Sequence, residues 1–75
     1  MIRVISRPRD LQTARVLAGY SQRGLCRKAG VNPATLNKAE KSARQVLPET
    51  AKAIATALDL EMNDLFDIRQ EVSCE

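Results

Sequence analysis

The segment SQRGLCRKAGVNPATLNKAEKS, from Ser21 to Ser42, constrains the fold of this chain most strongly. It holds two short helical patterns separated by a turn. Ser21 is suited to cap the first helix, because its hydroxyl can accept a hydrogen bond from a free amide of the first turn. Gly30 is suited to end that helix in left-handed backbone, which is costly for residues that carry a Cβ atom. The segment therefore predicts two helices that meet at a tight corner.

The second of these helices is predicted to bury one side and expose the other. Asn32 can cap it, and Pro33 fits its first position, where the missing N–H costs nothing. Leu36 and Ala39 lie on one side and are expected to face the core. The other side carries small and polar residues: Ala34, Thr35, Asn37 and Lys38. An exposed helix that follows a tight corner suits insertion into the major groove of DNA.

Matching residues extend beyond this segment over most of the chain. They are Ser21-Gln22, Leu25, Cys26, Gly30-Val31, Leu36, Glu40, Leu58-Asp59-Leu60 and Asp64-Leu65-Phe66. On these residues the chain, from about Leu11 to Phe66, resembles the lambda-repressor-like, Cro-type (XRE) helix-turn-helix DNA-binding family. The resemblance implies a compact five-helix domain that binds operator DNA, usually as a dimer, and reads it with the third helix. Ser42 departs from the family pattern, because a glycine usually ends the reading helix there.

The rest of the chain completes one domain, residues 1–75, with a core at 8–66. Residues 1–7 are β-branched and basic, so they predict a short strand or an extended arm. Residues 67–75 are polar and predict a frayed tail. The expected fold is all-α. Three further helices are predicted from apolar stripes. The stripes are Leu11, Ala14, Leu17 and Ala18 before Gly19; Ala51, Ile54, Ala55 and Leu58 after Pro48; and Met62, Leu65 and Phe66 in residues 61–66.

Charge is unevenly distributed along the chain. Residues 1–44 hold ten of the twelve Lys and Arg residues and two of the nine acids. The basic half includes the two-helix segment, so a polyanion would be attracted to the first half and repelled by the second. An ordinary solvated surface is the alternative interpretation.

Composition argues against an enzyme and against a bound cofactor. The chain has no histidine, and its two cysteines show no paired spacing, which disfavours a structural zinc site. It has no phosphate-binding glycine loop. Cys26 is expected in the core and Cys74 as a free thiol in the tail. We expect no metal and no small-molecule ligand. With no long apolar run, we also expect no membrane span and a cytoplasmic location.

Four residues of the second helix are candidates for reading base edges. Thr35 can contact a thymine methyl group, Lys38 can donate to guanine, and Asn37 can pair with adenine. Ala34 can make only apolar contacts. Few of these side chains can make two hydrogen bonds to one base, which predicts modest direct readout of sequence.

Five residues are candidates for phosphate contacts: Gln22, Arg23, Asn32, Lys41 and Arg44. The resemblance implies that Gln22 contacts a phosphate and braces the reading helix, and that the loop with Lys41 and Arg44 meets the backbone. Capping alone is the competing role for Asn32. Glu40 is expected to form an internal salt bridge, since phosphate would repel it. Arg3, Arg7 and Arg9 predict either an arm that reaches a groove or a disordered basic tail.

The predicted function is a transcription regulator, a repressor, that binds double-stranded DNA specifically and inserts its third helix in the operator major groove. The alternative is a protein-interaction module, antitoxin-like or regulator-binding, that docks through its acidic half. Activation, and a phage, plasmid, restriction–modification or antitoxin context, fit the same residues. We expect a homodimer on a near-palindromic operator. Its candidate interfaces are the strand Ile2–Ile5 and the C-terminal residues Met62, Leu65, Phe66 and Ile68.

Overall fold

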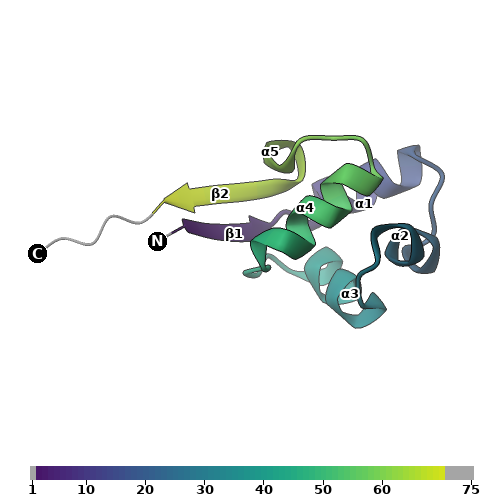
Figure 1. Ribbon diagram of the computed structural model, residues 1–75, viewed down its shortest axis with the longest axis horizontal. Helices are drawn as coiled ribbons and strands as arrows, with labels where there is room; N and C mark the ends of the chain where they lie inside the picture. The colour runs from purple at the N-terminus through teal and green to yellow at the C-terminus, as the bar shows by residue number, and fades with distance from the viewer. Residues whose placement is uncertain (1, 71–75) are drawn as a thin grey trace, which may run out of the picture.

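A computed structural model describes residues 2–70 of the chain. Its elements follow in the order β1 (Ile2–Ser6), α1 (Pro8–Leu17), α2 (Gln22–Ala29), α3 (Pro33–Lys41), α4 (Pro48–Ala57), α5 (Met62–Leu65) and β2 (Phe66–Gln70). The expected helices are present. The term all-α is approximate, because β1 and β2 form a two-stranded antiparallel sheet. In Figure 1 the helices gather at one end and the sheet runs out from them along the long axis.

The strand predicted at the N-terminus is confirmed, and the frayed tail is wrong for residues 67–70. Val4 lies opposite Ile68, and Ser6 lies opposite Phe66. The tail forms a strand because β1, far away in sequence, offers it a hydrogen-bonding edge. The same pairing shortens the fifth helix, which ends at Leu65 rather than at Phe66. Cys74 and the remainder of the predicted tail lie outside the described residues.

The strand β1 is held along both of its edges. On the edge away from β2, Val46 donates its N–H to the Val4 carbonyl at 2.8 Å, and Ser6 donates its N–H to the Arg44 carbonyl at 2.8 Å. The segment 44–46 thus lies along β1, with a bridge between Ile5 and Gln45. Residues 2–6 therefore form neither a free DNA-reaching arm nor an open edge for a second copy.

The three arginines predicted for that arm lie in or next to β1 and α1. Arg7 donates a hydrogen bond to the Asn63 carbonyl and lies 3.3 Å from the Asp10 carboxylate. Arg3 lies within β1, and Arg9 is exposed in the first turn of α1. The disordered-tail interpretation is therefore wrong for residues 2–7.

The core draws apolar side chains from every element of the structure. Its buried members are Val4, Leu11, Leu25, Cys26, Leu36, Ala39, Val46, Ala51, Ile54, Ala55, Leu58, Leu65 and Phe66. Leu65 and Phe66 are each 1% exposed, so they belong to the core and cannot serve as dimer contacts. Leu17 is 82% exposed, so the stripe predicted along α1 fails at its last turn. Leu17 lines a surface hollow beside Leu58 and Leu65 instead of entering the core.

The corner between α2 and α3 forms as the sequence predicts. The Ser21 hydroxyl accepts a hydrogen bond from the Gly24 N–H at 3.0 Å, and Gly30 adopts φ 73°, in the left-handed region. Asn32 caps α3 by accepting from the Ala34 N–H at 2.8 Å. Ser42 ends α3 in extended backbone with φ −152°, a conformation that does not require glycine.

Cys26 gives a test of this packing. It is buried, and burial, followed by the charge of Glu40, raises the pKa of its thiol. We expect slow alkylation of Cys26 in the native state at pH 8 and rapid alkylation in urea, as followed by peptide mass spectrometry. Cys26→Ser should lower the unfolding free energy by about 1–3 kcal/mol, because a hydroxyl replaces an apolar contact. Equal alkylation rates with and without urea would contradict burial.

Candidate nucleic-acid interface

The helix α3 presents the predicted reading surface to solvent. Leu36 and Ala39 are fully buried, so they fix which side of the helix faces inward. The residues predicted to read bases lie on the other side, with Thr35 half-buried and the rest exposed: Ala34, Asn37 and Lys38. The exposed end of α3 also carries Lys41.

A groove of about 640 Å³ lies between the starts of α2 and α3. It brings predicted phosphate contacts, Gln22 and Arg23, beside predicted base-reading residues, Ala34 and Asn37. The rest of its lining comes from the end of α1, the cap of α2 and the start of α3: Arg15, Ser21 and Pro33. One side of α3 therefore has polar and cationic groups next to it.

A second groove, of about 280 Å³, lies on the other side of α3. It brings Thr35 and Lys38 together with Arg44 from the loop between α3 and α4. The Arg44 guanidinium donates to the Ser42 hydroxyl at 3.4 Å. The remaining lining residues, Gln45, Val46, Leu47 and Thr50, were not predicted as site residues; their closeness to Arg44 in sequence was the available signal.

Neither groove is lined by a carboxylate. The cations Arg23, Lys38 and Arg44 therefore face these grooves without a local negative charge in the lining. This arrangement places these three of the ten basic residues of the first half of the chain on the two flanks of α3. The electrostatic field at α3 consequently suits a polyanion such as a nucleic-acid backbone.

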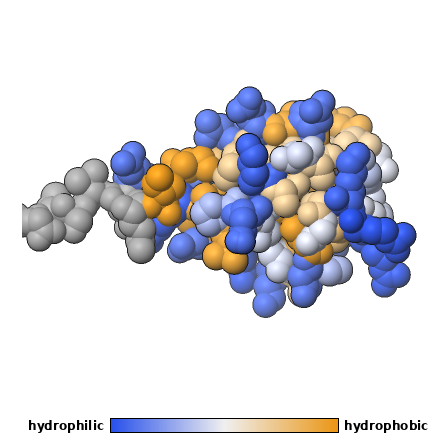
Figure 2. All heavy atoms as spheres, in the orientation of Figure 1, coloured by the Kyte–Doolittle hydropathy of each residue, from blue (hydrophilic) through white to orange (hydrophobic). Residues whose placement is uncertain are grey.

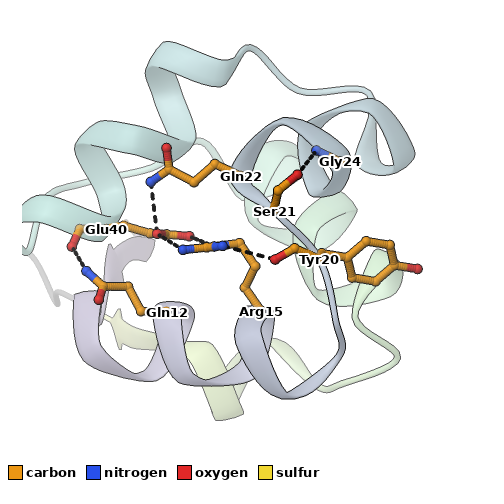
Figure 3. Close-up of polar contacts among 7 residues, drawn as sticks. All are labelled: Gln12, Arg15, Tyr20, Ser21, Gln22, Gly24 and Glu40. Atoms are coloured by element: carbon orange, nitrogen blue, oxygen red, sulfur yellow. Dashed lines mark hydrogen bonds and ion pairs between the residues drawn. The ribbon is translucent and has the colours of Figure 1, made fainter.

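The carboxylate of Glu40 holds α3 to its neighbours (Figure 3). Glu40 is 3% exposed, and its two oxygens accept from the Arg15 Nε and Nη2 atoms at 2.8 and 3.1 Å. The Gln22 Nε2 atom donates to the same carboxylate at 3.0 Å. The predicted internal salt bridge of Glu40 is confirmed, and Gln22 braces α3 through Glu40, while its phosphate contact stays a prediction.

Two backbone contacts complete this network. Gln12 of α1 donates to the Glu40 carbonyl at 2.8 Å, and Arg15 also donates to the Tyr20 carbonyl at 3.0 Å. Gln12 and Arg15 were not predicted as partners of Glu40, because Arg15 stands 25 residues from Glu40 and no local pattern links them. Together these contacts fix α3 against both α1 and α2.

The side chain of Asn32 is committed to its cap, so a phosphate contact would use its amide nitrogen. Among residues 2–70 no group of His, Cys, Asp and Glu side chains is arranged to hold a metal ion. Within the same range, no helix has the length and apolar character needed to cross a membrane.

Comparisons with known proteins agree with this geometry. A family model described as helix-turn-helix (HTH_3) matches residues 11–65. The chain is also similar to the crystal structure of the restriction-modification controller protein C.AhdI from Aeromonas hydrophila. The two are 28% identical with a TM-score of 0.70, and the match covers 76% of this chain and 86% of that chain. The comparison with curated proteins gave no match.

The Glu40 network predicts a large cost for removing the carboxylate. In Glu40→Gln the Arg15 side chain, 16% exposed, loses its counter-charge. We expect a loss of about 3 kcal/mol in unfolding free energy, at the lower end for a broken buried pair, measured by urea denaturation. The control Glu49→Gln changes an exposed acid in the first turn of α4 and should cost less than about 1 kcal/mol. Similar losses in both variants would contradict the role assigned to Glu40.

Proposed function

The chain belongs to the helix-turn-helix family, whose model spans more than half of its length, and from this premise we propose that it is a sequence-specific transcription regulator that inserts α3 into the major groove of an operator. The observation that carries the proposal is the exposed face of α3, bounded by two grooves that contain cations and no carboxylate. Family membership also marks a DNA-binding regulator rather than an enzyme.

In the proposed complex, α3 reads base edges with residues on its exposed side. Lys38 donates to guanine, Asn37 pairs with adenine and Thr35 meets a thymine methyl group. Ala34 supplies a small apolar contact near the start of the helix. The major groove is wide enough to admit a helix, so these side chains can reach the bases without opening the duplex.

The proposed phosphate contacts lie on the two flanks of α3. Gln22 and Arg23 would bind the backbone at one flank, and Lys41 and Arg44 would bind it at the other. The Gln22 amide nitrogen carries two hydrogens, so it can donate to Glu40 and to a phosphate at the same time. Asn32 would contribute at the start of α3. These contacts set the position of the reading helix and carry little sequence information.

We further propose that the regulator binds as a homodimer on a near-palindromic operator. A short helix reads only a few base pairs, and two copies about one helical turn apart double the sequence that is read. Repression follows where the operator overlaps a promoter, because the bound dimer excludes the polymerase. The proposed site of action is the cytoplasm, as the compartment that holds the DNA. Similarity to a controller protein supports the regulatory role.

Lys38 tests the reading role of α3. Lys38→Ala should weaken binding to a duplex selected from random DNA by about 1–3 kcal/mol and relax the preference at one base pair. Fluorescence anisotropy on selected and random duplexes measures both effects. Lys52→Ala, an exposed cation on α4 outside both grooves, is the matched control and should change neither. Equal weakening on selected and random DNA would assign Lys38 to phosphate instead.

Arg44 tests the backbone contacts. Arg44→Ala should weaken binding to all duplexes similarly and reduce the slope of log affinity against log salt by about one. The measurement is a salt titration of duplex binding, with Arg44→Lys expected to restore the slope. An unchanged slope in Arg44→Ala would exclude this phosphate contact. Failure of every variant and of the wild-type chain to bind any duplex would favour the protein-interaction alternative.

A further inference from the structure

The outer edge of β2 has no strand beside it among residues 2–70. In an antiparallel pair of strands, the direction of the backbone hydrogen-bonding groups alternates along each strand. The N–H and C=O of one residue point to the neighbouring strand, and those of the next residue point away from it. The backbone groups of Val4 and Ser6 contact segment 44–46, so they are directed away from β2. The residues opposite them, Ile68 and Phe66, must therefore direct their own backbone groups to the outer edge of β2.

One group on that edge is already satisfied. Phe66 donates its N–H to the Met62 carbonyl at the end of α5. The N–H and carbonyl of Ile68 remain on the edge, with those of Gln70 and the Phe66 carbonyl. These groups suit another strand, because an unpaired edge of this kind is a ready template for strand addition.

The β2 sequence, Phe-Asp-Ile-Arg-Gln, is complementary to itself when it is reversed about Ile68. In an antiparallel pair of two β2 strands centred on Ile68, Asp67 lies opposite Arg69 of the second copy, and Arg69 lies opposite Asp67. We propose that the partner of this edge is β2 of a second copy of this chain, related by a two-fold axis at Ile68. The proposal rests on the homodimer of the proposed function and names its interface.

The backbone hydrogen bonds fit this register. Ile68 of each copy donates its N–H to the Ile68 carbonyl of the other, and Gln70 of each donates to the Phe66 carbonyl of the other. The two copies then form one continuous four-stranded sheet, and the Phe66 N–H keeps its bond to Met62.

The side chains fit it as well. Ile68 is 41% exposed and Ile2 is 57% exposed, and the register places them diagonally on the same face of the sheet. The two-fold axis places the two Ile68 side chains opposite each other on that face, where each covers apolar surface of the other, and Ile2 flanks Ile68 within each copy. In Figure 2 apolar residues extend along the sheet end of the molecule, away from the helices. On the opposite face, Arg3 and Arg69 lie side by side, next to the position that Asp67 of the second copy takes.

A charge-reversal exchange tests this register. Arg69→Asp places two aspartates opposite each other in a homodimer, and Asp67→Arg does the same with two arginines. Each variant alone should dimerise roughly ten- to thirtyfold more weakly than wild type, because attraction becomes repulsion at both symmetric positions. An equimolar mixture should form a heterodimer of near wild-type affinity, because both facing pairs are then opposite in charge. Sedimentation equilibrium measures all four samples.

The control pair, Lys52→Glu and Glu49→Lys, makes the same changes in net charge at exposed positions on α4. Each control variant should dimerise with the affinity of wild type, and mixing the two should not raise that affinity. Circular dichroism checks that every variant folds. If a reversal variant does not fold, Asp67→Asn with Arg69→Gln replaces it, and this neutral double variant should lose the salt dependence of dimerisation that wild type shows.

Three results would overturn the interface: wild type monomeric at about 1 mM, reversal variants that dimerise like wild type, or a mixture that does not associate while wild type does. Duplex binding is measured separately. If the chain binds DNA but substitutions at residues 67 and 69 do not change its dimerisation, the proposed function is retained and the proposed interface is wrong. If the mixture forms a heterodimer but the chain binds no duplex, the proposed interface is retained and the proposed function is wrong.

Discussion

The structure depends on how the buried charge of Glu40 is satisfied. A carboxylate this far from water is stable only with a counter-charge and hydrogen-bond donors. Arg15 of α1 supplies the charge, and Gln22 of α2 supplies a further donor. The position of α3 is therefore favoured in which its one acid, Glu40, meets donors from α1 and α2. A purely apolar contact would hold α3 in place but would resist rotation about its axis less strongly. The polar network thus acts together with buried Leu36 and Ala39 in fixing which residues of α3 face outward.

The same network separates the structural charges from those available to DNA. Arg15 lines the groove between α2 and α3, but its guanidinium is paired with Glu40 and also donates to the Tyr20 carbonyl. Its positive charge is compensated inside the protein. Arg23, Lys38 and Arg44 carry the uncompensated charge around α3, with no carboxylate in either groove lining. Since α3 is held before any ligand arrives, binding need not order it, and less of the interaction energy is lost to ordering.

Local patterns in the sequence correctly predicted the features that depend on nearby residues. The caps at Ser21 and Asn32, the left-handed turn at Gly30 and the buried side of α3 all depend on neighbours within one or two turns of helix. The errors arose where distant segments meet. The strand β2 forms because β1, sixty or more residues earlier, offers it a hydrogen-bonding edge, and Phe66 enters the core from that strand. The Arg15–Glu40 pair spans 25 residues and has no periodic signal. The exposure of Leu17 depends on what packs beyond the end of α1, which periodicity does not encode. The DNA contacts themselves remain predictions.

The sheet and the proposed DNA-binding loop are mechanically connected through Ser6. Its hydroxyl accepts from the Arg44 N–H at 3.1 Å and donates to the Ser42 carbonyl at 3.2 Å. Ser6 is itself 1% exposed at the end of β1, where its own N–H binds the Arg44 carbonyl. The backbone on both sides of the loop after α3 is therefore fixed by one residue of the sheet. The antiparallel pairing thus joins β2 to β1, and Ser6 joins β1 to the backbone that carries Arg44.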